Sequence, residues 1–147
     1  MYKGKKVVVV LPAYNAAKTL EKTYKEIPFD LVDEVILCDD NSKDNTAELA
    51  KSLGINHVIV HEKNKGYGGN QKSLYNKALE IKGDIVIMLH PDYQYTPLLI
   101  PSMVNIIGMH TVLIVLGQYR SKIGAHFSAI RFRGIGQRVC FQRSLHF

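Results

Sequence analysis

The sequence predicts an α/β fold, in which a Rossmann-like parallel sheet carries flanking helices and precedes a poorly ordered C-terminal tail. Three observations predict it. Short apolar, β-branched runs alternate with amphipathic patterns of helical spacing, only a few residues separate them, and polar residues follow each apolar run. With 147 residues, of which 46% are hydrophobic, the chain is long enough for one domain with its own core.

The first predicted unit is a strand over residues 6–11 and a helix over residues 16–27. Val7, Val8, Val9 and Val10 form the apolar run, which is too short for a signal peptide before Pro12. In the helix, Leu20, Tyr24 and Ile27 recur at intervals of four and three and therefore share one face.

The second unit repeats this order, with a strand over residues 34–38 and a helix over residues 46–53 that ends at Gly54. The third has a strand over residues 57–61 and a helix over residues 69–81. Such alternation is typical of right-handed crossovers, which place every strand parallel to its neighbours.

Two further strands are predicted over residues 85–89 and 112–116. Residues 98–117 are long enough to span a bilayer, which leaves a transmembrane helix as an alternative. Pro101, Asn105 and other polar residues interrupt this stretch, so a helix followed by a strand is favoured.

Charge separates the body of the chain from its tail. Six of the 19 basic residues follow residue 108, and no acid follows Asp92. Residues 1–108 therefore contain 13 basic and 13 acidic residues. The neutral body gives no reason to expect nucleic acid as a partner. We expect a truncated nucleotide-sugar-binding domain over residues 1–117 and a basic, divergent tail over residues 118–147.

The two cysteines, Cys38 and Cys140, have neither a CxxC spacing nor a disulfide pattern. This usage fits a reducing compartment, and we expect a cytoplasmic protein.

Candidate site residues follow the predicted strands. In a parallel sheet these loops meet at one edge, where such folds bind ligands. Asp39 and Asp40 end the second strand and could bind a base or ribose, although neighbouring Ser42 or Asp44 could simply cap a helix. The glycine-rich loop that contains Lys65 and Gly66 could hold a phosphate with backbone N–H groups, or be a flexible turn.

Asp92 is the candidate metal ligand. Mg²⁺ and Mn²⁺ prefer one or two carboxylates together with phosphate oxygens and water. His90 could coordinate an ion or hydrogen-bond a nucleotide, or it could belong to a His-Pro turn that leads the chain out of the sheet. No zinc-ligand spacing is present.

Four motifs occur in order, VVVVLPAYN, LCDDNSKDNT, NKGYGGNQKS and MLHPDYQYTP. Together they resemble the nucleotide-sugar-binding half of family 2 glycosyltransferases, in particular the dolichol- or polyprenyl-phosphate mannosyl- and glucosyltransferases. The resemblance covers residues 5 to about 108 and implies a GT-A fold. Beyond it, nothing resembles the family's acceptor half.

The resemblance also implies roles for individual residues. Pro12 and Tyr14 would flank the base, with Asn15 in the same loop, and Asp40 with Asp39 would bind the base or ribose. Lys65 would lie near the phosphates, and Asp92 corresponds to the second acid of the family's DxD metal motif. Gly66, His90 and Gln94 are further expected to bind the nucleotide sugar. Two positions depart from the family pattern, because His90 replaces the first acid of the DxD metal motif and Ala16 replaces a frequent glutamate.

The implied function is inverting transfer of a sugar from a UDP- or GDP-linked donor to a polyprenyl phosphate or glycan acceptor, with Mg²⁺ or Mn²⁺. Acceptor chemistry of this kind implies association with the cytoplasmic face of a membrane. The sequence identifies no catalytic base. Two alternatives remain: a fragment that binds the nucleotide sugar without transferring it, and a membrane-associated protein that uses its basic tail.

Overall fold

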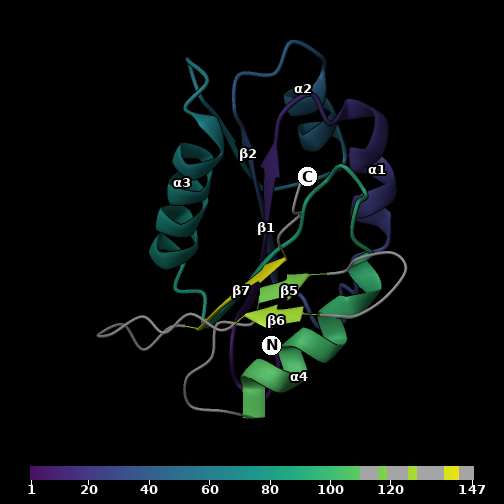
Figure 1. Ribbon diagram of the computed structural model, residues 1–147, viewed down its shortest axis with the longest axis vertical. Helices are drawn as coiled ribbons and strands as arrows, with labels where there is room; N and C mark the ends of the chain where they lie inside the picture. Colours follow the sequence, from purple (N-terminus) through teal and green to yellow (C-terminus); the bar gives the residue numbers. More distant parts are fainter. Residues whose placement is uncertain (110–115, 119–125, 129–137, 143–147) are drawn as a thin grey trace.

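The computed structural model describes residues 1–109, 116–118, 126–128 and 138–142, with side chains for residues 1–108. Within these ranges one sheet has the strand order β3-β2-β1-β4-β7-β5-β6 (Figure 1). The strands are β1 (Val7–Ala13), β2 (Glu34–Asp39), β3 (His57–Val60), β4 (Ile85–Met88), β5 (Leu116–Gln118), β6 (His126–Ser128) and β7 (Arg138–Gln142). The helices are α1 (Ala17–Lys25), α2 (Thr46–Ser52), α3 (Gly66–Glu80) and α4 (Ile100–Met109), preceded by the 3₁₀ turn η1 (Pro97–Leu99).

The parallel sheet is confirmed. β1 lies between β2 and β4 and pairs parallel with both, while β3 pairs parallel with β2. Helices α1, α2 and α3 make the crossovers between successive strands, as the alternating pattern predicted. All four strands therefore end at the same edge of the sheet, which is the edge toward which the β1 arrow points in Figure 1.

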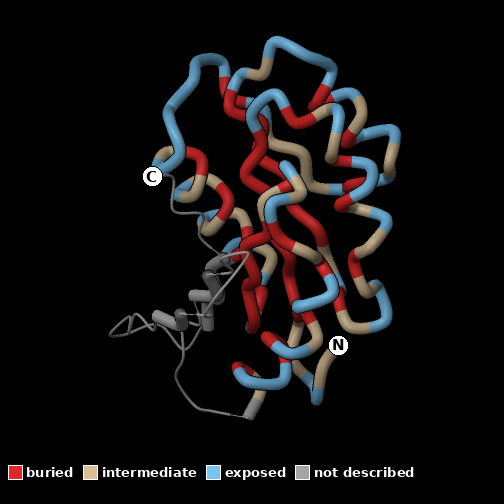
Figure 2. Tube along the Cα trace, turned by 45° about the vertical axis from the view of Figure 1, so that its right-hand side comes forward, coloured by how far each residue is buried: buried red, intermediate tan, exposed pale blue. Residues whose placement is uncertain are grey.

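The core consists of two apolar layers, one on each face of the sheet. Alternate residues of β1 divide between them, because successive side chains of a strand point to opposite faces. Val7 and Val9 pack in the layer that includes residues of α1 and α4, whereas Val8 and Val10 pack in the layer that includes Leu74 of α3. Figure 2 shows the buried segments running along the central strands and the exposed ones on the outside.

The bounds of α1, α2 and α3 differ from the predicted ones by one to three residues, and the two largest differences have a physical cause or a consequence for the site. α1 ends at Lys25, two residues before the predicted end, because Pro28 disfavours helical backbone in the residue before it. α3 begins at Gly66 and not at residue 69, so most of the glycine-rich loop forms the first helical turn. This difference places the loop's backbone at the edge of the sheet where the strands end.

The end of the chain bears on two further predictions. The strand predicted over residues 112–116 lies outside the described residues except for Leu116, which begins β5. β6 and β7 lie in the predicted tail, where the sequence predicted no strand, and β7 pairs parallel with β4. Most of the stretch considered as a membrane span forms η1 and α4, and none of the described helices is long and apolar enough to cross a bilayer.

Substitution of Gly83, which follows α3, tests how tightly the end of this helix packs against β1. A Cβ atom there would lie 2.7 Å from Val8 Cγ2 and 3.2 Å from the Ala78 carbonyl oxygen. We expect Gly83→Ala to lower the free energy of unfolding by about 1 kcal/mol, which urea denaturation can measure. Gly68→Ala is the matched control, because its Cβ would meet no atom within 4 Å. Equal changes in the free energy of unfolding for the two substitutions would contradict close packing of Gly83 against Val8 and Ala78.

Candidate functional site

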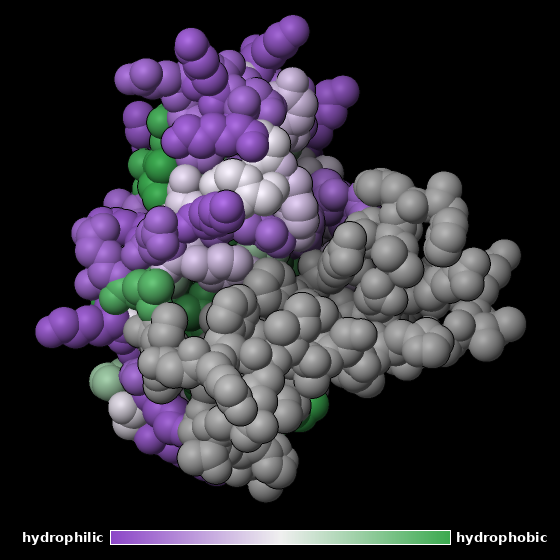
Figure 3. Space-filling view, turned by 60° about the vertical axis from the view of Figure 1, so that its left-hand side comes forward, coloured by the Kyte–Doolittle hydropathy of each residue, from purple (hydrophilic) through white to green (hydrophobic). Residues whose placement is uncertain are grey.

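A pocket of about 290 Å³ opens where β1, β2 and β4 end. Its lining comes from the end of β1, from the loops that follow β1, β2, β3 and β4, and from the start of α3. The lining residues are Pro12, Ala13, Tyr14, Ala16, Asp40, Asn64, Gly66, Tyr67, Asn70, His90, Pro91 and Asp92. Viewed from the side of α3, the same end of the molecule is largely hydrophilic (Figure 3). The convergence of polar strand-end loops that the sequence predicted is therefore present.

Asn15 fastens the loop after β1 to the loop after β2. Its backbone N–H donates to Ser42 Oγ at 2.8 Å, and its Oδ1 accepts from the Lys43 N–H at 2.8 Å. Asn15 has a φ of 51°, a left-handed conformation that asparagine tolerates better than most residues. Its side chain therefore shapes one wall of the site and does not line the pocket.

The two adjacent aspartates have different surroundings. Asp39 accepts hydrogen bonds from the backbone N–H and the hydroxyl of Ser42, so its carboxylate closes the turn after β2. Asp40 lines the pocket although only 3% of its surface is exposed. Since successive side chains at a strand end point in opposite directions, one carboxylate shapes the loop and the other faces the ligand space.

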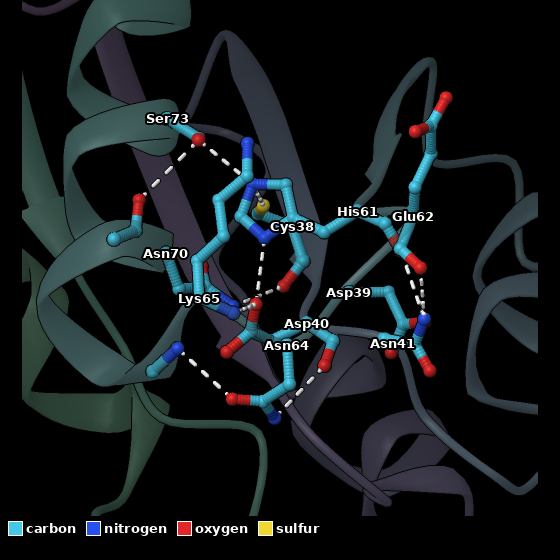
Figure 4. Close-up of polar contacts among 12 residues, drawn as sticks. Cys38, Asp39, Asp40, Asn41, His61, Glu62, Asn64, Lys65, Asn70 and Ser73 are labelled. Atoms are coloured by element: carbon cyan, nitrogen blue, oxygen red, sulfur yellow. Dashed lines mark hydrogen bonds and ion pairs between the residues drawn. The ribbon is translucent and has the colours of Figure 1, made fainter.

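Asp40 is held as an anion. Its Oδ1 accepts from the Lys65 backbone N–H at 2.8 Å and lies 2.7 Å from His61 Nδ1 (Figure 4). Burial alone would raise the pKa of Asp40, but the hydrogen bonds from Lys65 and His61 outweigh burial and lower it below its usual value. The carboxylate is thus an ionised acceptor at neutral pH.

The glycine-rich loop is tied to the same aspartate. Asn64 Nδ2 donates to the Asp40 carbonyl oxygen at 3.1 Å, and Asn64 Oδ1 accepts from the Gly66 N–H at 2.9 Å. Gly66 has a φ of +71°, a conformation that favours glycine. This turn brings backbone N–H groups of the first turn of α3 to the pocket, where they can bind an anion.

Asn70 contributes a buried amide to the pocket wall. Its Nδ2 donates to the Cys38 carbonyl oxygen at 2.8 Å and is 3.5 Å from that of Ala13, which joins α3 to the ends of β1 and β2. Among the residues the structure describes, its Oδ1 is a buried side-chain atom without a hydrogen-bond partner. Because an unpaired buried acceptor costs free energy, a ligand donor that reached it would be favoured.

The loop after β4 supplies an imidazole and a carboxylate. His90 Nε2 lies 3.1 Å from the Tyr67 hydroxyl, and the two rings stack with centroids 5.5 Å apart. Asp92 is exposed at the pocket, and its Oδ1 accepts from the Gln94 N–H at 3.1 Å. No group of three potential ligands occurs in the described ranges, so the described protein atoms alone do not complete a metal site.

The structure therefore brings six of the ten predicted residues together around one pocket. They are Pro12, Tyr14, Asp40, Gly66, His90 and Asp92. The other four support them: Asn15 and Asp39 through the loop contacts, Lys65 through its N–H to Asp40, and Gln94 through its N–H to Asp92.

Sequence reasoning missed four polar residues at the site, namely His61, Asn64, Tyr67 and Asn70. Three of them belong to the glycine-rich motif, for which the sequence predicts only a phosphate-binding backbone. His61 is the last residue of the strand predicted over residues 57–61. The polar side chain of His61 at the end of a predicted strand is the sequence signal that indicates a place at the site.

Acid should destabilise the fold through three hydrogen-bonded carboxylates. The pKa values of Asp33, Asp40 and Asp44 all lie below the usual value, because hydrogen bonds outweigh burial at each. These groups stabilise the folded state above an unfolded pKa of about 3.9, and the stabilisation is lost as pH falls through the lowered folded pKa values. We expect the Tm to hold between about pH 7 and 5 and to fall below about pH 4. A Tm that rises on acidification would contradict this.

Comparison with known proteins agrees with this geometry. The family model described as Glycosyl transferase family 2 matches residues 8–143, and so extends beyond residue 108, where the recognised motifs end.

Two curated relatives illustrate the similarity. The UDP-N-acetylglucosamine–dolichyl-phosphate N-acetylglucosaminyltransferase of Methanococcus voltae is 32% identical over 109 residues, which cover 63% of this chain and 43% of the relative. The dolichol-phosphate mannosyltransferase of Pyrococcus furiosus is 31% identical over 120 residues, covering 78% of this chain and 33% of the relative. The chain thus spans less than half the length of these relatives.

Solved structures show the same fold. Glucosyl-3-phosphoglycerate synthase from Mycobacterium tuberculosis, in complex with Mn²⁺, UDP and glucosyl-3-phosphoglycerate, matches with a TM-score of 0.66 and 29% identity. The match covers 80% of this chain and 45% of the synthase. A complex of the same synthase with Mn²⁺ and UDP-glucose has a TM-score of 0.63. These neighbours confirm a GT-A glycosyltransferase fold.

Proposed function

Because the chain belongs to glycosyl transferase family 2, whose model matches residues 8–143, we propose that its strand-end pocket binds a nucleoside-diphosphate sugar, UDP- or GDP-linked, together with Mg²⁺ or Mn²⁺. The observation that carries the proposal is the placement of Asp40, Gly66 and Asp92 around one pocket. Asp40 offers an ionised acceptor for base or ribose, and Asp92 offers a carboxylate for a hard cation. The turn at Gly66, whose own N–H donates to Asn64, leads into the first turn of α3, whose following backbone N–H groups can bind phosphate.

The surrounding residues suit the parts of such a donor. Pro12 and Tyr14 provide apolar surface for the base, and Tyr14, a residue that is 52% exposed, is accessible to stacking. Asn15 and Asp39 keep the two loops in place. The Lys65 side chain is assigned to the diphosphate, because its residue begins the turn that leads into α3.

The donor set suits Mg²⁺ or Mn²⁺. Asp92 offers an exposed carboxylate and His90 an imidazole nitrogen at the pocket, while the phosphates of the donor would supply further oxygens. When bound, such an ion would offset the negative charge that grows on the departing diphosphate. Complexes of the mycobacterial synthase contain Mn²⁺ with UDP, which supports a divalent ion here.

The proposed reaction is a single displacement. An acceptor oxygen forms a bond to the anomeric carbon while the bond between that carbon and the diphosphate oxygen breaks. The configuration of the anomeric carbon is thereby inverted. A lipid phosphate is the proposed acceptor, since the relatives are named for dolichyl and undecaprenyl phosphates. Such an acceptor is already ionised near neutral pH and needs no general base from this chain. We place this chemistry at the cytoplasmic face of a membrane.

A donor and acceptor panel tests the proposal. The purified chain is titrated by calorimetry with UDP, GDP and their sugars in the presence of Mn²⁺, and transfer to a polyprenyl phosphate is then assayed with each donor that binds. Saturable binding of one nucleotide series supports the pocket assignment. Binding without transfer would favour the alternative of a nucleotide-sugar-binding module, and no binding of any donor would overturn the proposal.

A further inference from the structure

His61 links the proposed nucleotide pocket to the interior of the domain. It follows β3, and only 5% of its surface is exposed. Its Nδ1 lies 2.7 Å from Asp40 Oδ1 and its Nε2 lies 2.8 Å from Ser73 Oγ on α3 (Figure 4). The imidazole is therefore held at both nitrogens, between the end of β2 and the second turn of α3.

The partners determine which ring nitrogen carries a proton. The Asp40 carboxylate only accepts hydrogen bonds, so His61 Nδ1 must donate to it. A second ionisable group, Cys38, has its Sγ 3.5 Å from His61 Nε2. Burial raises the pKa of Cys38 to about 12, so the thiol is neutral and does not compete with Asp40 for the imidazole.

We propose that His61 is a positioning residue, which fixes the Asp40 carboxylate in the orientation that binds the donor nucleotide. The inference rests on the proposed function. Both close contacts, from His61 Nδ1 and from the Lys65 N–H, converge on Oδ1 of the carboxylate. Two donors from different directions restrict rotation about the terminal torsion of Asp40, which is otherwise broad in aspartate.

Conservative substitutions of His61 distinguish the contribution of Nδ1 from that of Nε2. The amide nitrogen of asparagine can occupy the place of Nδ1 and keep the donor to Asp40, whereas that of glutamine takes the place of Nε2 and abandons Asp40. We expect His61→Gln to weaken nucleoside diphosphate binding about tenfold and His61→Asn to bind within about threefold of wild type. Ser73→Ala is the control, because it removes the far contact of the ring, together with the Ser73 hydrogen bond to the Gly69 carbonyl oxygen, and leaves the contact with Asp40 in place.

A double-mutant cycle shows whether His61 acts through Asp40. Dissociation constants for UDP and GDP with Mn²⁺ are measured for wild type, His61→Gln, Asp40→Ala and the double variant, with a Tm for each. We expect the tenfold effect of His61→Gln to vanish in the Asp40→Ala background. An equal effect in both backgrounds would assign His61 a merely structural role and overturn the inference.

The outcomes for the two proposals are distinguishable. Wild-type protein that binds no nucleoside diphosphate would refute the proposed function itself. If His61→Gln fails to fold, the affinity of His61→Asn is still informative, because the inference requires it to stay within about threefold of wild type. A folded His61→Asn variant that has lost nucleotide binding altogether would contradict the inference, because the donor to Asp40 is retained.

Discussion

Asp40→Ala should weaken binding of a nucleoside diphosphate by about 2 kcal/mol, or roughly thirtyfold in Kd. The physical reason is that Asp40 is the ionised carboxylate in the pocket wall, and charge-assisted hydrogen bonds from a base or ribose are stronger than neutral ones. Calorimetric titration with UDP and GDP in the presence of Mn²⁺ measures the change.

Asp39→Ala is the matched control for this experiment. Asp39 is the adjacent residue and is equally buried, but its carboxylate binds Ser42 and does not line the pocket. We expect Asp39→Ala to lower the Tm with a smaller effect on affinity. An unchanged affinity in Asp40→Ala, at a Tm that shows a folded protein, would mean that Asp40 does not touch the nucleotide.

Asp92→Asn should remove most of the divalent-ion dependence of nucleotide binding. Asparagine keeps the shape of the side chain and loses the charge, and hard cations bind carboxylates in preference to neutral oxygens. We expect a loss of about 1 to 3 kcal/mol in the presence of Mn²⁺ and little change in its absence. Titrations of wild type and variant with and without Mn²⁺ give the four dissociation constants that this comparison requires.

Asp30→Asn is the control for the loss of one negative charge, because Asp30 is exposed and lies outside the pocket lining. We expect it to leave both titrations unchanged. Equal dependence on Mn²⁺ in wild type and Asp92→Asn would place the ion on other residues.

The parallel core of the fold could be predicted because its signals are local. The run of valines directly predicts the strand β1, and the spacing of Leu20 and Tyr24 directly predicts the helix α1. Parallel topology places the loops after the strands at one edge of the sheet. It therefore predicts that Asp40 and Asp92 meet, although their positions in the sequence differ by 52.

The missed contacts depend on register and on packing between distant segments. His61 reaches Asp40 across 21 residues, and Asn70 reaches Cys38 across 32, so neither pairing leaves a local pattern. β6 and β7 could not be predicted for a similar reason: their pairing with β5 and β4 depends on long-range contacts, and residues 126–128 and 138–142 show no apolar run like that of β1.

The pocket at the strand ends can be tested most directly by mapping amide chemical shifts while UDP or GDP is added with Mg²⁺. We expect shifts at Ala13, Asp40, Gly66 and His90, and selective broadening near Asp92 when Mn²⁺ replaces Mg²⁺. A second hollow, lined by residues such as His57 and Lys77 of β3 and α3, provides the internal comparison. Shifts confined to that hollow, or none at saturating nucleotide, would contradict the account.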